Sequence, residues 1–199
     1  MSLYLPQRSL RILCIILLLT ITPASAGTGS STMSEATLQL VNFFEPTLKA
    51  FGFRKSRQTW YLRKDEVVLV VNVQGSQWGN QAYVNLGVYL RALGDEVRPP
   101  LSHCHILQRL GQLVGRENAL RLMELLDFDK KISADDRSAE LRRLLENFGM
   151  PWLQQFDSLE SARKVLRSDS PRPLVDPNAL PILGWTLQEW QGNTSGELH

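Results

Sequence analysis

The fold is decided by residues 67–90, which read VVLVVNVQGSQWGNQAYVNLGVYL. The second half of this stretch, residues 82–90, alternates between aliphatic and other residues, which is the pattern of a strand with one buried face. The first half begins with the aliphatic run at 67–71, which favours a strand covered on both faces. Between the halves, residues 75–80 are polar and glycine-containing and predict a hairpin loop. So short a link requires two antiparallel strands, because a parallel pair would need a crossover of a dozen or more residues.

A third strand and a helix are predicted upstream of this hairpin. Residues 53–63 contain Trp60 and Tyr61 and end in a turn-prone Lys-Asp pair, which indicates a strand. Residues 34–51 carry apolar side chains at helical spacing, with Ser34 as a plausible N-cap and Gly52 as a C-terminal stop. Pro46 falls inside this helix and is expected to kink it or to remove one backbone hydrogen bond.

Helices are predicted to dominate the chain downstream of the hairpin. Residues 104–114 fit neither period and are expected to form a fourth strand or a short helix, and residues 118–128 look helical. Ser133 begins a capping sequence before a helix that Gly149 and Pro151 should close, and residues 157–160 repeat such a sequence. The sequence therefore predicts an α+β fold. Its N-terminal helix packs on an antiparallel meander of three to four strands, and C-terminal helices follow.

The first 26 residues have the layout of a secretory signal peptide. Arg8 and Arg11 precede the apolar run at 12–21, and Ala24-Ser25-Ala26 supplies the small residues of a cleavage site. The run is shorter than the roughly 20 residues of a membrane-spanning helix, so no stable span is expected after cleavage. We expect cleavage after Ala26 and a periplasmic or secreted protein. The alternative is a cytoplasmic protein whose translation starts at Met33.

The remaining organisation follows from length and charge. A linker is expected at 27–33, a single α+β domain at 34–168 and a proline-rich extended tail at 169–199, docked through Trp185 and Trp190. The leader holds two arginines and no acid, so its removal takes the formal net charge from +2 to zero. A neutral chain has no long-range field that attracts polyanions, which argues against nucleic acid as the partner.

The cluster His103-Cys104-His105 is the strongest candidate for catalytic chemistry. On a strand the two histidines would share a face, as metal ligands could, but a zinc site needs three or four ligands. The remaining histidine is at the chain end, so no metal and no cofactor is predicted. Cys104 would point away from both histidines, which favours a buried structural cysteine over a nucleophile. An enzyme is therefore not the favoured prediction; the alternative is a small hydrolase or ligand-binding enzyme that uses His103 or His105.

Polar and aromatic residues on the predicted strands are better candidates for a binding surface. Asn85 shares a face with Tyr83 and Tyr89, and exposed amides beside aromatic rings can form a recognition surface. The structural alternative, which stays open, is that the amides satisfy the hairpin loop and the strand ends. The candidate binding residues are Trp60, Asn72, Gln74, Trp78, Asn80, Tyr83, Asn85, His105 and Arg109.

Several short runs resemble a bacterial family, the domain-of-unknown-function 4304 family, over about residues 34–167. They are FGFRK at 51–55, TWY at 59–61, VNVQ at 71–74, GN at 79–80, VNLGV at 84–88, CHI at 104–106, RLG at 109–111 and FGMP at 148–151 with Phe156. The resemblance implies an α+β fold and brings no established activity. Some members look like immunity partners of bacterial toxins, which supports a binding role by association. The predicted function is thus a non-enzymatic, exported protein-binding module, with an immunity protein as its more specific form.

Overall fold

The computed structural model describes residues 34–168 and 172–192. All of them belong to one unit, Met33–His199, while the other unit, Met1–Thr32, contributes none. The predicted leader, its cleavage after Ala26 and the linker at 27–33 therefore lie outside the described residues. Within the described ranges, no helix is both long enough and apolar enough to cross a membrane.

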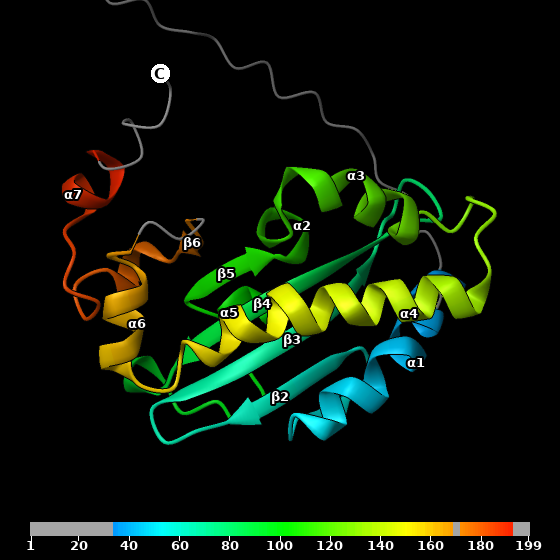
Figure 1. Cartoon of the computed structure of the whole chain (residues 1–199). Helices are drawn as coiled ribbons and strands as arrows, with labels where there is room; N and C mark the ends of the chain where they lie inside the picture. Colours follow the sequence, from blue (N-terminus) through cyan, green and yellow to red (C-terminus); the bar gives the residue numbers. More distant parts are fainter. Residues whose placement is uncertain (1–33, 169–171, 193–199) are drawn as a thin grey trace, which may run out of the picture. The chain divides into compact units, whose positions relative to one another are not determined.

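An antiparallel sheet carries the fold, and its strands follow one another across it in chain order (Figure 1). Its described strands are β1 (Arg54–Ser56), β2 (Thr59–Arg63), β3 (Val67–Gly75), β4 (Ala82–Leu90), β5 (Ile106–Arg109) and β6 (Leu174–Val175). The predicted antiparallel meander is confirmed, with six described strands in place of three to four. One extra strand arises because the segment at 53–63 turns back at Arg57, whose φ is 56°.

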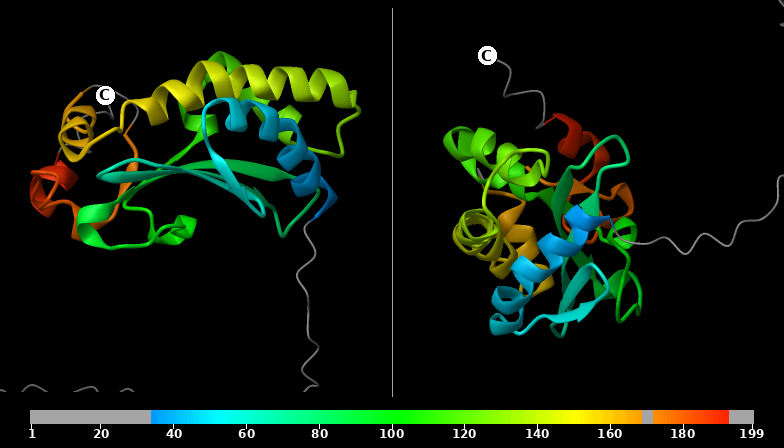
Figure 2. Two further views of the ribbon diagram at one scale, coloured as in Figure 1. Left: turned by 90° about the horizontal axis from the view of Figure 1, so that it is seen from below. Right: turned by 90° about the vertical axis from the view of Figure 1, so that its right-hand side faces the viewer.

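Helices cover one face of this sheet (Figure 2, left). The predicted alternation is confirmed, because the aliphatic rows of β3 and β4 lie opposite each other in register and share the helical face. Val68 and Val70 are buried on the other face, which confirms that the run at 67–71 is covered on both sides. The buried side chains of the helical face in these two strands are Val67, Leu69, Val71, Val73, Ala82, Val84, Leu86, Val88 and Leu90.

Helix α1 (Glu35–Ala50) has the two ends that the sequence predicts. The Ser34 hydroxyl oxygen accepts a hydrogen bond from the backbone N–H of Thr37 at 3.2 Å, which makes it the N-cap. Gly52 follows the last turn with a φ of 85°, a left-handed conformation that glycine adopts without strain. The helix runs through Pro46, which has no N–H to donate. One stripe of α1 packs into the core through Leu40, Phe44 and Leu48.

The prediction that Gly149 and Pro151 end a helix is wrong. Helix α4 (Ala134–Leu144), capped by Ser133 as predicted, continues through a π-helical turn (Leu145–Gly149) into α5 (Met150–Gln154). Pro151 is the second residue of α5 and follows directly after the π-helical turn. Gly149 is buried, and a Cβ there would lie 2.8 Å from a methyl group of Leu145. Close packing thus explains this glycine, which the sequence alone presents as a helix stop.

The segment at 104–114, for which the sequence predicts a strand or a short helix, contains both. Strand β5 ends at Arg109 and leads directly into α2 (Leu110–Leu113), which is followed by α3 (Gly115–Leu126). Neither element is long enough to show a clear period, because each has four residues. Helix α3 begins a few residues before the predicted start at 118.

The C-terminal part is more ordered than the loss of periodicity suggests. Helix α6 (Leu159–Val165) begins at the predicted capping sequence, 157–160, and Ser158 is its N-cap. After it, β6 pairs with β5, a 3₁₀ turn covers Pro177–Ala179, and α7 (Leu187–Gly192) ends the described chain. Trp185 and Trp190 pack edge to face with ring centres 5.5 Å apart. The local structure of this part could not be predicted from the sequence, because proline-rich sequence carries neither a helical nor a strand period. The side chains of this part that join the core include Ala179 and Leu183.

Candidate binding surface

A row of polar side chains crosses the sheet on the face away from the helices. It consists of Ser56, Thr59, Asn72, Asn85 and Arg109, and we call it the polar row. Strand register places each residue opposite the next, from β1 to β5. Residues directly opposite each other in paired strands project from the same side of a sheet. Five strands therefore present polar side chains at one level of this face.

Hydrogen bonds join neighbouring members of this surface. The amide nitrogen of Asn72 donates to the Thr59 hydroxyl oxygen at 2.8 Å. The amide nitrogen of Asn85 donates to the side-chain oxygen of Gln74 at 3.3 Å. Thr59 and Asn85 are buried, Asn72 is half-buried and Gln74 is exposed. The inner amides thus satisfy one another, as the structural interpretation expects, while the outer part of the surface faces solvent.

Arg109 is the charged end of the polar row. Its guanidinium lies 4.7 Å from the centre of the Tyr83 ring, a cation–π distance. Among the residues that the structure describes, no carboxylate forms an ion pair with it. The side chain is exposed. Arg109 therefore offers a positive charge and planar donors to a molecule that reaches this edge.

The other half of the same face is apolar and is covered by the chain itself. Residues 91–104 fold beneath the sheet after β4 and include two 3₁₀ turns, Arg91–Leu93 and Leu101–His103 (Figure 2, left). A Cβ on Gly87 would lie 2.8 Å from the Cys104 sulfur, so this glycine permits the close approach. The residues buried here are Val68, Val70, Tyr89 and Cys104, with Tyr61 and Leu107 packed against them.

The two histidines of the His-Cys-His cluster lie in different environments. His103 is in the second 3₁₀ turn, is exposed, and its Nδ1 lies 2.7 Å from a Glu96 carboxylate oxygen. His105 is buried against the Tyr89 ring, and its Nδ1 accepts a hydrogen bond from the backbone N–H of Leu90 at 2.9 Å. Burial lowers the pKa of His105, and the nearby carboxylates of Asp176 and Glu96 oppose this only in part. His103 and His105 therefore do not share one strand face, because the strand begins at Ile106.

Cys104 is buried, as the sequence predicts. Burial raises the pKa of its thiol to about 12, and the charge of Glu96 adds to the effect. At neutral pH the group is a thiol and not a thiolate. In the described part of the chain, no three histidine, cysteine or acidic side chains gather closely enough to hold a metal ion.

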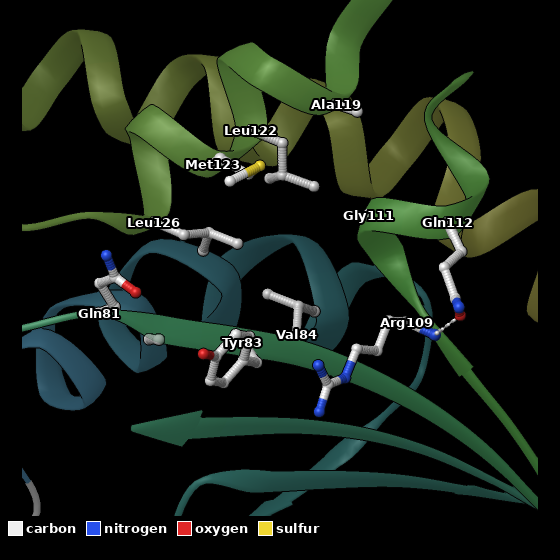
Figure 3. A pocket seen from close by; sticks show the side chains of 11 residues that line it. Gln81, Tyr83, Val84, Arg109, Gly111, Gln112, Ala119, Leu122, Met123 and Leu126 are labelled. Atoms are coloured by element: carbon white, nitrogen blue, oxygen red, sulfur yellow. Dashed lines mark hydrogen bonds between the residues drawn. The ribbon is translucent and has the colours of Figure 1, made fainter. Parts of the chain in front are cut away.

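A cavity of about 380 Å³ lies where β4 continues beyond the end of β5 (Figure 3). β5 pairs with residues 85–88 of β4, so residues 82–84 have no strand beside them on that edge among the described residues. Helix α3 crosses over the gap and supplies apolar side chains, among them Leu122, Met123 and Leu126. Gln81 lies at one end of the cavity and Arg109 at the other.

The structure brings together five of the predicted binding residues and separates the other four. Asn72, Gln74, Tyr83, Asn85 and Arg109 gather on the polar half of the face. His105 belongs to the buried packing around Tyr89, at the covered end.

The remaining three predicted residues lie elsewhere. Trp60 is opposite Val71 and 1% exposed, so it faces the helices. Trp78 is 90% exposed in the loop between β3 and β4. In the same loop, the Asn80 amide nitrogen donates to Asp129 at 3.3 Å. The two tryptophans therefore do not join the amides in one patch, because the register turns Trp60 away from the open face.

Two features of the surface were missed from the sequence. Thr59, the hydrogen-bond partner of Asn72, is found once the register of β2 on β3 is known, because the two residues lie opposite each other. The sequence indicates the cavity only weakly, because α3 carries more apolar residues than its buried side needs. Leu120 and Met123 remain 72% and 68% exposed on this helix.

Comparison with known proteins gave a single kind of match. The model of a family described as a domain of unknown function (DUF4304) matches residues 44–155, which is more than half of the chain. Searches among curated proteins and among solved structures gave no match. The matched range contains β1 to β5, the polar row and the cavity.

Proposed function

Because this chain belongs to the DUF4304 family, whose description assigns no activity, we propose its function from its own surface: it is a non-enzymatic, exported module that binds another protein. The contact surface is the polar half of the sheet face, with Tyr83 and Arg109 at its edge. In the more specific form of the proposal, the module is an immunity protein that blocks its partner.

The observation that carries the proposal is the polar row, in which Ser56 and Asn72 are half-buried and Arg109 is exposed. The covering segment at 91–104 protects the apolar half of the face and stops short of the amides. Tyrosine and arginine are enriched where proteins bind each other, because each combines a large contact area with directed hydrogen bonds. The Tyr83–Arg109 pair is such a group, and within the described residues its charge forms no ion pair. We therefore expect a partner with acidic groups opposite Arg109.

The chemistry around Cys104 and His105 supports a binding role over a catalytic one. A thiol with a pKa of about 12 is a poor nucleophile at neutral pH. His105 uses its Nδ1 to hold the Leu90 N–H, which fits a structural role for the ring. The alternative enzyme would then depend on the exposed His103, which pairs with Glu96.

One purification tests both compartment and partner. The full-length gene, tagged at its C-terminus, is expressed in the native host, and the protein is isolated gently and analysed by mass spectrometry. We expect a mature chain beginning at Gly27 and a stoichiometric complex with a second protein. A chain beginning at Met33 or Ser34 would favour the cytoplasmic alternative, and recovery of monomer alone would contradict the binding proposal.

A matched pair of charge reversals tests the surface within that complex. Arg109→Glu places an acid at the edge of the polar row, where an acidic partner is expected, so the affinity should fall at least tenfold. Arg143→Glu makes the same change on the exposed side of α4 and should leave the affinity within twofold. Equal affinities for the two variants in a direct titration would remove the polar row from the interface.

A further inference from the structure

We propose that the cavity beneath α3, which adjoins the proposed protein contact, is a site for a small amphipathic carboxylate. The ligand would place its carboxylate at Arg109 and its apolar body beneath α3. This inference does not rest on the proposed function. The two share Tyr83 and Arg109, whereas the α3 wall of the cavity lies outside the polar row.

The size and the closed ends of the cavity favour a small molecule. Its volume of about 380 Å³ falls in the range of about 300–1,000 Å³ that is usual for ligand pockets. Gln81 forms a bridge with Asp127 at one end, and at the other end β5 turns into α2 after Arg109. An extended peptide adding to the free edge of β4 would meet both obstacles, so a compact ligand fits better than a passing strand.

The lining separates apolar from charged groups along the length of the cavity. Val84 and four side chains of α3 form the apolar part, and Arg109 and Gln112 lie together at one end (Figure 3). The α3 wall includes Met123, which is 68% exposed although it is apolar. A bound apolar chain would remove part of this surface from water, which is favourable.

Charge and length define the class of ligand. The guanidinium of Arg109 suits a carboxylate, with which arginine can form two parallel hydrogen bonds, and no described acid forms an ion pair with it. A strand rises by about 3.3 Å per residue, so the four steps from Gln81 to Asn85 span about 13 Å, comparable with a carboxylate of about eight to ten carbons. The geometry therefore points to a medium-chain monocarboxylate.

Binding of decanoate to the full chain, measured by isothermal titration below the micelle concentration, tests this site. We expect saturable binding of one molecule per chain, with 1-decanol and decyltrimethylammonium binding at least fivefold more weakly. Arg109→Gln should weaken the binding of decanoate about fivefold to tenfold, because it removes a charge-assisted pair at an exposed site. Arg116→Gln, an exposed change on α3 outside the lining, should not alter it.

Two variants of the wall separate this site from the protein contact. Ala119→Leu fills part of the cavity and should reduce decanoate binding at least tenfold, whereas Ala139→Leu on the exposed side of α4 should not. Met123→Glu changes an exposed side chain, so the fold should be kept while the new charge repels the carboxylate.

The outcomes of these titrations are decisive. Absence of saturable binding, or equal binding by wild type, Ala119→Leu and Met123→Glu, would overturn the carboxylate site and leave the proposed function standing. If Ala119→Leu instead abolished the protein complex while decanoate did not bind, the cavity would be an anchor for the partner, and this inference would be wrong. Loss of the protein complex in Arg109→Glu alone bears on the proposed function and not on the cavity.

Discussion

The sheet face opposite the helices has two halves, which are built from the same strands. Residues 91–104 pack over one half and not over the other. Towards one end the strands carry Val68, Val70 and Tyr89, and residues 91–104 cover them. Towards the other end the same strands carry Asn72 and Asn85, and among the described residues no segment like 91–104 lies over them. Burial of apolar side chains explains the first half, since it removes them from water. In the second half the inner amides bond to neighbours and the outer polar groups face solvent, which is the basis of the proposed contact.

His105→Ala should give the largest loss of stability if the covered half holds the fold together. The change deletes a buried ring that contacts Tyr89 and leaves the Leu90 N–H without its acceptor. Together these effects should lower the free energy of unfolding by about 3 kcal/mol. Urea denaturation measures the loss, and His103→Ala, at an exposed histidine, is the matched control with an expected change below about 0.5 kcal/mol. Similar small losses for both variants would show that His105 is not structural.

The same histidine makes stability depend on pH. Burial lowers the pKa of His105 in the folded protein below its ordinary value of 6.5, so the unfolded chain binds the proton more readily. The free energy of unfolding should therefore fall as the pH drops below about 6.5, because protonation favours the unfolded state. Denaturation at pH 7.5 and pH 5 should show a smaller difference for His105→Ala than for the wild type. An identical pH dependence of both proteins would contradict this assignment.

Gly87→Ala tests how closely the covering segment packs. The added Cβ would lie 2.8 Å from the Cys104 sulfur and 3.1 Å from its Cβ, so the segment must shift. Overpacking of this kind should cost about 2 kcal/mol. Gly79→Ala is the control, because nothing lies within 4 Å of a Cβ at that position. Equal melting temperatures for the two variants would mean that residues 91–104 pack loosely on the sheet. The covered half would then not be the more tightly packed half of this face.

Local sequence signals predicted most of the sheet and failed where packing decides the outcome. The alternation at 82–90 and the run at 67–71 predicted the central strands, because burial in a sheet imposes a period of two. Gly149 and Pro151 predicted a helix end that does not exist, because the π-helical turn and contact with Leu145 override their local preference. The strand β6 could not be predicted, since a pair of residues has no period.

The candidate surface was predictable in part for the same reason. Alternate positions of a strand share a face, which correctly grouped Asn85 with Tyr83 on β4. The side that Trp60 faces depends on the register of β2, which the sequence does not state. The cavity depends on β5 ending after four residues, a consequence of the turn into α2 that no short motif announces.

Gln74→Glu should have the smallest effect on stability and tests the open half most directly. The new side chain keeps an oxygen that can accept from Asn85 and adds a charge at an exposed position, so the free energy of unfolding should change by less than about 0.5 kcal/mol. In the protein complex, however, the added charge should weaken binding to an acidic partner, because like charges oppose each other at the interface. Gln155→Glu, an exposed change on the helical side, is the control for both measurements. A loss of stability as large as that of Gly87→Ala would mean that the amides of the open half hold the fold as firmly as the covered half does, and the division between a structural and a binding half would fail.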